Sequence, residues 1–423
     1  MDLRQFGPNY IRYNRYHINT NVFDIYYDMS HVRRMKPNPG GQLSPEQIVG
    51  RDGLIAEIWE ILEGRSIYMN DLRRIGKTQI MVKMHAAPIK DWITIKCDLG
   101  GIHTAGEFAT QAFRMSHEAL GKKKRTLRRM GDLLGKIKGM EVAGLVKLPD
   151  GTAAPWKEVL RRTFADLEEE MVSLGPNQRI LLLWDEVPFL LENISKREGA
   201  KVAMEVLDIL RALGQDHDHI RLLLTGSIGL HHILNELKKQ GYNGSPLNRM
   251  EHIQPGPLTP EDSVSLARTM LTKNTLRCDD VDKCASKLAS AVGHVPFYIH
   301  RLISRMPKTG KSTTRSIQTL LDQEITSDNN DWDLQHYRDR LKPYYGADEK
   351  LALQILDAVA IGGVLGFDAI KREVSAQAPV DDERLRDLLK FLCKDHYLVR
   401  NKKNEYSFYL ALIRRWWRLD RSL

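Results

Sequence analysis

The chain is long enough for two or three domains, and its charge balance is positive. It has 423 residues, and its 63 lysines and arginines against 54 aspartates and glutamates give a formal net charge of +9. A domain usually spans about 100 to 200 residues, so each part can bury a hydrophobic core. The positive balance favours a polyanionic partner.

Composition also excludes several classes of protein. No apolar run approaches the length of a membrane span, and residues 1–4 lack the pattern of a secretory signal, so we expect a cytoplasmic protein with no membrane partner. The four cysteines lack paired metal-ligand spacing, which predicts free thiols. The 14 histidines show no metal spacing either, and His231 and His232 are expected to pack or to cap a helix.

Residues 1–47 are predicted to form an extended N-terminal arm. They are rich in Tyr, Asn, Arg and Pro, and they contain the turn-forming run Pro37-Asn38-Pro39-Gly40-Gly41. We expect this arm to pack on the body of the protein or on a neighbouring subunit. An amphipathic helix is predicted next, over residues 53–63.

The most informative motif follows a strand predicted over residues 66–70. The run from Asp71 to Thr78 has the form of a phosphate-binding loop, except that Asp71 replaces the usual first glycine. In such a loop, backbone N–H groups surround the phosphates of ATP, the lysine bridges the β- and γ-phosphates, and the threonine ligates Mg²⁺. A solvated lysine that opens an ordinary helix is the alternative for this run alone. The predicted ATP-binding residues here are Asp71, Arg73, Arg74, Ile75, Gly76, Lys77, Thr78 and Gln79.

A basic insertion of about residues 115–155 follows the second predicted strand, residues 92–97. A block of like charges is typical of a solvated or disordered face, and the alternative is a site for nucleic-acid phosphate or another acidic partner. No aromatic residue interrupts the block, so a nucleic acid would be bound through its backbone rather than by base stacking. The candidates are Lys122, Lys123, Lys124, Arg125, Arg128 and Arg129.

Two acidic residues end the third predicted strand. Residues 179–184 form a continuous apolar run after a helix predicted over residues 156–174, as expected for a strand buried on both faces of a parallel sheet. Asp185 is therefore predicted to hold Mg²⁺, and Glu186 to polarise the attacking water. An acidic strand end that caps a surface turn is the alternative.

The next predicted strand, residues 220–227, ends in small hydroxyl residues. In a sheet whose strand ends face a nucleotide, Thr225 and Ser227 can contact the γ-phosphate or the attacking water. Ser227 is equally suited to cap the helix predicted after it. The two roles are compatible.

The rest of the chain is predicted to be mainly helical. Helices are expected between residues 260 and 306. From residue 347 onward, three short helices and a β-hairpin predict a winged helix, a variant of the helix-turn-helix. Lys402 and Lys403, in the turn of that hairpin, are further candidates for contact with nucleic acid.

Six short segments occur in a characteristic order along the chain. They are Val49-Gly50-Arg51-Asp52, Arg73-Arg74 in the phosphate loop, Thr225-Gly226-Ser227, Ser245-Pro246-Leu247-Asn248-Arg249, Gly293 with Pro296, and Arg414-Arg415-Trp416-Trp417. Together they resemble the archaeal-type P-loop ATPases, a branch near the signal-transduction ATPases (STAND) and the origin-recognition initiators of the AAA+ class. The resemblance covers residues 49–417, without the basic insertion.

The resemblance implies an α/β fold with several domains. It implies an AAA+-like P-loop NTPase core with a parallel sheet (residues 48–257), a helical lid (258–343) and a C-terminal winged-helix domain (344–423). The nucleotide would lie between core and lid, and the winged-helix domain would dock differently in each nucleotide state.

The resemblance also implies roles for single residues. Arg51 and Pro296 would contribute to nucleotide binding, and Thr225 to catalysis. Arg249 would sense the γ-phosphate or act as a finger in a neighbouring subunit, and an exposed arginine after a turn is the alternative. Asp71 and the leucine after it depart from the family pattern.

The expected function is that of an ATP-binding switch with slow, Mg²⁺-dependent hydrolysis. Asp71 tolerates unusual backbone angles, and Arg73 and Arg74 are expected to neutralise its carboxylate, so we expect binding to persist. The expected partners are ATP and DNA or a DNA-associated protein, and nucleotide is expected to promote a homo-oligomer. The alternatives are a STAND-like signalling scaffold whose winged helix binds only protein, and a nucleotide-binding pseudoenzyme.

Overall fold

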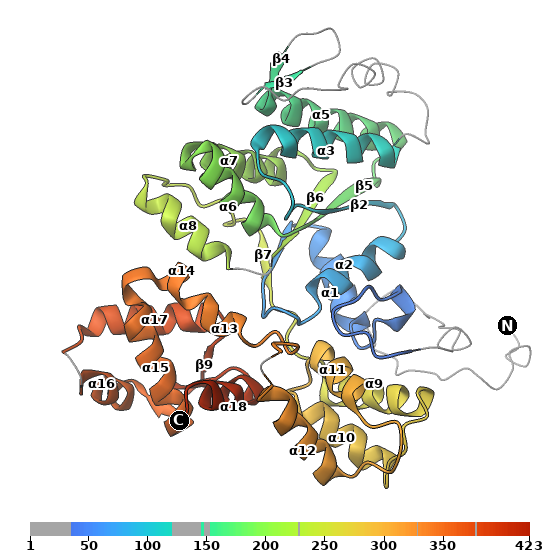
Figure 1. Cartoon of the computed structure of the whole chain (residues 1–423). Coiled ribbons are helices and arrows are strands. Elements are labelled where there is room, and N and C mark those ends of the chain that lie inside the picture. Colours follow the sequence, from blue (N-terminus) through green and yellow to red (C-terminus); the bar gives the residue numbers. More distant parts are fainter. Residues whose placement is uncertain (1–34, 121–144, 148–152, 227–228, 328, 377–378) are drawn as a thin grey trace, which may run out of the picture. The chain divides into compact units, whose positions relative to one another are not determined.

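The computed structural model describes residues 35–120, 145–147, 153–226, 229–327, 329–376 and 379–423 (Figure 1). The chain forms two compact units. The first joins Met1–Gly50 to Leu258–Glu324, and the second joins Arg51–Pro257 to Ile325–Leu423. The boundaries predicted for arm, core, lid and winged-helix domain stay predictions. Among the described site residues, Pro296 belongs to the first unit and the others to the second.

A five-stranded parallel sheet forms the centre of the second unit. The strands lie in the order β2-β5-β6-β1-β7, so β1 neighbours β6 and β7 rather than β5. The four predicted strands are present within two residues of their expected bounds, whereas β7 was not predicted. The strands are β1 (Ile67–Met69), β2 (Trp92–Asp98), β5 (Arg179–Asp185), β6 (Ile220–Thr225) and β7 (Glu251–Ile253).

Each face of this sheet has its own hydrophobic core. Along β5, Leu182 and Trp184 belong to one core, and Leu181 and Leu183 to the other, because successive side chains of a strand point to opposite faces. Helices of the first core are α3 (Ala105–Leu120), α5 (Trp156–Leu174), α6 (Val187–Glu198), α7 (Ala200–Asp216) and α8 (Leu230–Lys239). Helices of the second core are α1 (Asp52–Leu62) and α2 (Lys77–Ala86). Burial on both sides explains the continuous apolar sequence of β5.

The predicted basic insertion lies mostly outside the described residues. Helix α3 extends to Leu120, and a short antiparallel pair, β3 (Leu145–Lys147) and β4 (Ala153–Pro155), precedes α5. The six basic candidates between residues 122 and 129 are not among the described residues, so their role stays a prediction.

The first unit is mainly helical. The backbone N–H of Asn38 donates to His300 Nδ1 (3.1 Å), and Asn274 Nδ2 donates to the carbonyl oxygen of Met35 (2.9 Å). The described end of the N-terminal segment therefore packs on helices of its own unit. These helices are η3 (Pro45–Gln47), α9 (Pro260–Lys273), α10 (Val281–Ala291), α11 (Pro296–Arg305) and α12 (Thr314–Ile325).

The C-terminal part of the second unit combines helices with a small antiparallel sheet of order β8-β10-β9. Its strands are β8 (Leu365–Gly366), β9 (Leu398–Arg400) and β10 (Glu405–Phe408). Its helices are α13 (His336–Asp339), α14 (Leu341–Tyr345), η4 (Gly346–Asp348), α15 (Glu349–Gly362), α16 (Phe367–Ser375), α17 (Asp382–Lys394) and α18 (Ala411–Asp420). The three predicted helices and both hairpin strands are present, and the winged-helix assignment itself stays a prediction.

Helices that could cross a bilayer are absent from the described ranges, because none combines sufficient length with sufficient apolarity.

Candidate nucleotide-binding site

The phosphate loop connects β1 to α2 through two residues in the left-handed backbone region. Arg74 has a φ of 68°, and Gly76, the N-cap of α2, has a φ of 103°. A Cβ atom would be strained at Gly76, which explains the glycine there. Asp71 is not among the positive-φ residues of the loop. The backbone at Asp71 therefore does not require the glycine of the family pattern.

Lys77 lies at the centre of the loop. Its Nζ donates to the backbone oxygens of Asp71 and Leu72, both at 2.8 Å. Burial lowers the pKa of Lys77 to about 8, while nearby carboxylates, including that of Asp185, act in the opposite direction. The charge of this ammonium is thus sensitive to its surroundings, and a bound phosphate would stabilise it.

The Asp71 side chain is buried, at 3% exposure, and bonded to backbone. Its Oδ1 accepts from the N–H of Leu72 and its Oδ2 from the N–H of Gly256, each at 2.6 Å. The carboxylate therefore connects the phosphate loop to the segment after β7.

The expectation that the two loop arginines neutralise Asp71 was wrong. Arg73 Nε lies 3.2 Å, and Arg74 Nε 2.7 Å, from Oδ2 of Asp333, in the segment between α12 and α13. Backbone N–H groups stabilise the Asp71 carboxylate instead, which leaves both guanidinium groups to pair with Asp333. In this conformation the two arginines attach the C-terminal part of the unit to the phosphate loop.

Arg51 supports the loop from its other side. Its guanidinium donates to the carbonyl oxygens of Pro255 (2.9 Å), Gly256 (2.8 Å) and Ile75 (3.0 Å). These bonds join the loop to the same segment that Asp71 contacts. The arginine therefore positions the loop, and its predicted contact with nucleotide stays a prediction.

Thr78 and Asp185 meet at the carboxyl end of β5. Thr78 Oγ1 donates to Asp185 Oδ2 at 2.5 Å, and the backbone N–H of Glu186 donates to Oδ1 at 3.0 Å. A hydroxyl and a carboxylate side by side are oxygen ligands of the type that Mg²⁺ prefers. The two predicted magnesium ligands therefore fit that ion.

Glu186 stands at the start of α6 with a φ of 59°, an uncommon value for a residue other than glycine. The end of β6 runs close by: a Cβ at Gly226 would lie 2.4 Å from Pro188 Cδ and 3.7 Å from Glu186 Oε2. Only glycine fits at this approach. The predicted catalytic carboxylate is thus beside the end of β6, and Ser227 lies outside the described residues.

Thr225 is fully buried, and its Oγ1 has no hydrogen-bond partner among the residues that the structure describes. It pairs in register with Met69 of β1. Since β6 lies between β1 and β5, this hydroxyl stands between the phosphate loop and the acidic strand end. An unpaired buried hydroxyl costs about 1 to 3 kcal/mol, which a phosphate oxygen or a water could offset.

The other predicted site residues are placed as follows. Ile75 is buried, and Gln79 Oε1 is buried without a hydrogen-bond partner. Arg249 is exposed in the segment between α8 and β7. Pro296 is the first residue of α11. None of these placements decides the predicted roles.

Lys402 and Lys403 are exposed in the turn between β9 and β10. Asn401 Oδ1 accepts from the N–H of Lys403 at 2.9 Å, and Asn404 has a φ of 62°. These features shape the turn and leave both ammonium groups in solvent.

Sequence reasoning missed three contributors to the site. Gly256 and Asp333 contact loop side chains, and the positive charge of Arg340 also lowers the pKa of Lys77, after the larger effect of burial. Asp333 lies 259 positions from Arg74, and no motif marks it. Only the fold brings these residues to the loop.

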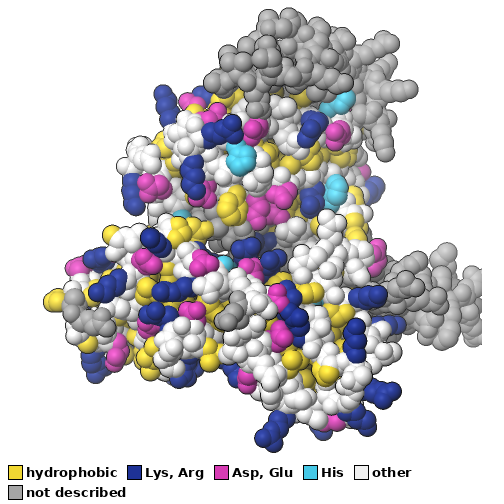
Figure 2. Space-filling model, in the orientation of Figure 1, with side chains coloured by type: hydrophobic (Ala, Val, Ile, Leu, Met, Phe, Trp, Pro, Cys, Tyr) yellow, Lys and Arg dark blue, Asp and Glu magenta, His cyan; other side chains and the backbone are white. Residues whose placement is uncertain are grey.

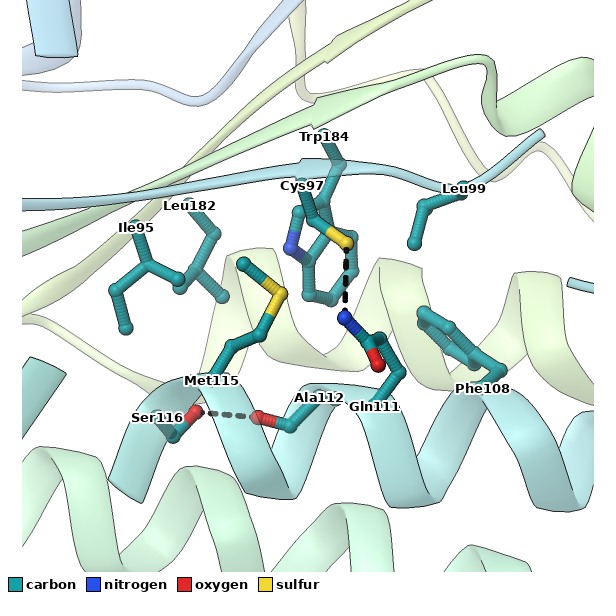
Figure 3. A pocket seen from close by; sticks show the side chains of 10 residues that line it. All are labelled: Ile95, Cys97, Leu99, Phe108, Gln111, Ala112, Met115, Ser116, Leu182 and Trp184. Carbon is teal, nitrogen blue, oxygen red and sulfur yellow. Dashed lines mark hydrogen bonds between the residues drawn. The ribbon is translucent and has the colours of Figure 1, made fainter. Parts of the chain in front are cut away.

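A small cavity lies within the core rather than at the nucleotide site (Figure 3). Its lining comes from β2, β5 and α3 and includes Cys97, Trp184 and Phe108. Gln111 Nε2 lies 3.8 Å from Cys97 Sγ, and burial raises the pKa of the thiol. Cys97 is therefore a protonated core residue.

This architecture defines the class of protein. A parallel sheet, a loop from β1 to α2 with a buried lysine, and an acidic end of β5 that contacts the loop threonine form the fold of a P-loop ATPase. The predicted α/β fold class is confirmed.

Comparison with solved structures gives several matches at low sequence identity. A Walker-type ATPase of Pyrococcus abyssi matches with a TM-score of 0.61 and 18% identity, over 92% of this chain and 99% of that one. The ORC2 protein of Aeropyrum pernix matches with a TM-score of 0.46 and 12% identity, over 93% and 96%. The RuvB Holliday junction branch migration motor of Thermotoga maritima matches with a TM-score of 0.37 and 12% identity, over 85% of this chain and 92% of that one. No family model and no curated protein matches the sequence.

Proposed function

We propose that this protein is an ATP-binding molecular switch that hydrolyses ATP slowly with Mg²⁺. The observation that carries the proposal is the contact between Thr78 of the phosphate loop and Asp185 of β5 at 2.5 Å. It joins the phosphate-binding element to the acidic strand end, and Lys77 and the unpaired Thr225 hydroxyl flank it. These groups are the parts that phosphoryl transfer to water needs.

Each group has a separate role in the proposed reaction. Lys77 would neutralise charge on the β- and γ-phosphates, and Thr78 and Asp185 would hold Mg²⁺, which would supply further positive charge to the phosphates. Glu186 accepts a proton from the attacking water. The Thr225 hydroxyl donates to the γ-phosphate or orients that water.

The contacts of the loop support a switch. Arg73 and Arg74 pair with Asp333, so the phosphate loop and the C-terminal part of the unit are connected directly. A triphosphate attracts the same guanidinium groups. ATP binding would therefore weaken the link to Asp333 and change how the C-terminal part docks.

The test measures ATP binding and phosphate release separately. Lys77→Ala is expected to weaken ATP binding about tenfold or more, because it removes a charge-assisted contact with phosphate. Glu186→Gln is expected to bind ATP as the wild type does and to release no phosphate. The exposed Lys90→Ala is the charge-matched control and is expected to behave as the wild type.

Two outcomes would change the proposal. Equal ATP affinity in wild type and Lys77→Ala would contradict the nucleotide site itself. ATP binding without phosphate release by the wild type, at any protein concentration, would leave the pseudoenzyme alternative.

For the partner, we propose DNA or a DNA-associated protein, contacted by the predicted winged helix. The net charge of +9 and the exposed pair Lys402 and Lys403 support it. Affinity for duplex DNA should fall steeply with salt, and the double variant Lys402→Glu/Lys403→Glu should reduce that slope by about two units. Charge reversal in the segment 122–129 tests the other candidates in the same way.

One observation favours the alternative, a scaffold that binds only protein. Cations of α17 are already paired with acidic neighbours: Arg384 with Asp348, and Lys390 with Asp387. On the face in Figure 2, Lys and Arg side chains are interspersed with Asp and Glu. No DNA binding at low salt, with or without ATP, would favour the scaffold.

We also propose that Arg249 acts in trans in an oligomer that ATP promotes. Its exposure between α8 and β7 supports contact with a second copy. Mixing Arg249→Ala with Glu186→Gln, each inactive alone, should restore part of the phosphate release. Unchanged phosphate release by Arg249→Ala alone would contradict any catalytic role.

A further inference from the structure

Two histidines and one aspartate converge away from the nucleotide site. His231 and His232 stand in the first turn of α8, and Asp395 follows α17. His231 Nε2 lies 3.1 Å from Asp395 Oδ1, and His232 Nε2 lies 2.7 Å from Oδ2. The ligand atoms of all three residues lie within 4.8 Å of one another. We propose that this cluster binds a divalent transition-metal ion of the Zn²⁺ type.

The donor set and its spacing fit that class of ion. Two imidazole nitrogens and one carboxylate oxygen are ligands of Zn²⁺, whereas Mg²⁺ and Ca²⁺ prefer oxygen alone. Zinc bonds of about 2.0 to 2.1 Å in a tetrahedron place ligand atoms about 3.3 Å apart. The separation of 3.1 Å between His231 Nε2 and Asp395 Oδ1 is close to this value. His232 Nε2 now hydrogen-bonds to Oδ2, so this imidazole would exchange that bond for the ion.

One of the nitrogens lacks a partner. His231 Nε2 is buried and has no well-aligned hydrogen bond within the described part of the chain, even though a carboxylate oxygen is 3.1 Å away. Two ligand atoms that are close but not aligned for a hydrogen bond are the arrangement expected around a shared ion.

Neighbouring residues fix the ligands in place. The hydroxyl of Tyr345 donates to Asp395 Oδ2 at 2.7 Å, and His232 Nε2 hydrogen-bonds to the same oxygen, so Oδ1 is the oxygen that faces His231. The ring of His232 stacks on Tyr344 with centroids 4.6 Å apart. A Cβ at Gly229 would lie 2.3 Å from His231 Cε1, so glycine makes room for that ring. Such support is typical of metal ligands.

Nearby charges set a limit on the affinity. Arg340 Nη2 donates to the backbone oxygen of Asp395 at 2.8 Å and repels a cation. Binding in the micromolar range or tighter is expected, rather than the far tighter binding of a four-ligand structural site.

The site would join two distant segments of the second unit. His231 and His232 lie on α8, in the stretch Arg51–Pro257 that contains the parallel sheet, and Asp395 lies in the C-terminal stretch Ile325–Leu423. Since the ion binds the folded protein and not the unfolded chain, it should raise the melting temperature of the full chain.

The experiment uses the full-length wild type, freed of metal by a chelator and titrated with Zn²⁺ against a chromophoric chelator. One equivalent of Zn²⁺ is expected to bind, and Co²⁺ in its place should give the strong visible absorption of a tetrahedral site. Zn²⁺ is expected to raise the melting temperature. His232→Ala and Asp395→Asn should each lose the tight equivalent and the thermal shift.

Two controls separate this site from other ligands. The exposed His103→Ala and the thiol variant Cys278→Ser are expected to keep full binding. Loss of binding in Cys278→Ser alone would overturn the proposal. So would a wild type that binds no Zn²⁺ equivalent, or one whose Co²⁺ spectrum is that of the aqueous ion; both readouts are independent of ATP.

Discussion

Asp71 departs from the sequence motif of the phosphate loop, but its side chain helps to hold that loop in place. Its two oxygens accept backbone N–H groups of Leu72 and Gly256, and Gly256 is also held through its carbonyl oxygen by Arg51. A carboxylate bonded in this way keeps its charge directed at the protein backbone. The two backbone N–H groups therefore partly offset the negative charge of Asp71, which would otherwise repel a phosphate.

Replacing this carboxylate should destabilise the protein. Asp71→Ala removes two hydrogen bonds to a charged group, and we expect a loss of about 3 kcal/mol in the free energy of unfolding. Urea unfolding measures it, and the exposed Asp216→Ala is the control, with a change under about 0.5 kcal/mol. If Asp71→Ala were as stable as the wild type, the proposed role of Asp71 in holding the loop to the segment after β7 would be contradicted.

Lys77 should make ATP binding depend on pH. Its pKa is lowered to about 8, and only the ammonium form attracts phosphate. Proton loss as pH rises through 8 should therefore weaken ATP binding about tenfold between pH 7 and 9. Calorimetric titration at several pH values checks this, with Lys77→Ala as the reference that should vary little. A flat profile in the wild type would contradict the assignment.

At the scale of elements, the approach of β6 to α6 determines where Thr225 and Glu186, the residues proposed to act in catalysis, lie. Gly226 passes so close to Pro188 that no Cβ fits, and this brings the end of β6 beside Glu186. The position of Thr225 relative to the acidic strand end follows from the same approach. A change at Gly226 should therefore affect hydrolysis without touching phosphate or Mg²⁺.

Gly226→Ala should slow phosphate release more than it weakens ATP binding. The added Cβ would lie 2.4 Å from Pro188 Cδ, which forces the two elements apart. We expect a loss of about tenfold or more in turnover, because small displacements of catalytic groups are costly. Gly53→Ala is the matched control, since a Cβ there meets nothing within 4 Å. Equal turnover in both variants would contradict the geometry.

The sequence was sufficient to single out the residues that stand in a recognisable local pattern. Lys77 and Thr78 follow a glycine at a helix start, and Asp185 follows an apolar strand, so local pattern suffices. The pairing of Arg73 and Arg74 with Asp333 could not be predicted, because Asp333 lies 259 positions from Arg74 and only the fold brings it to the loop. The bonds of Arg51 to backbone carbonyl oxygens carry no sequence signal either, and its contact with nucleotide stays a prediction.

At the scale of the whole molecule, the first unit contains a buried acid-sensitive group. His300 of α11 accepts a hydrogen bond from the backbone N–H of Asn38, so it holds the described end of the N-terminal segment. Burial lowers its pKa from 6.5 to about 4. The neutral imidazole is therefore favoured in the folded unit.

Stability of the first unit should fall in mild acid. The contribution of His300 is fully present above pH 6.5, and it is lost as pH falls toward 4, because the unfolded chain binds the proton more readily. The total effect is about 3 kcal/mol. Urea unfolding at several pH values should show a smaller acid loss in His300→Gln, and an unchanged one in the exposed His103→Gln. Identical pH profiles for wild type and His300→Gln would contradict the role.

The strand order also has a consequence for synthesis. Ile67 of β1 pairs with Leu223 of β6 and Glu251 of β7, so both neighbours of the phosphate-loop strand leave the ribosome long after it. A nascent chain that ends before β6 has no partner for this strand, and its apolar residues stay exposed meanwhile. Contacts between residues so far apart in sequence slow folding. The nucleotide site therefore completes late during translation, and this delay makes the growing chain a candidate for protection by chaperones.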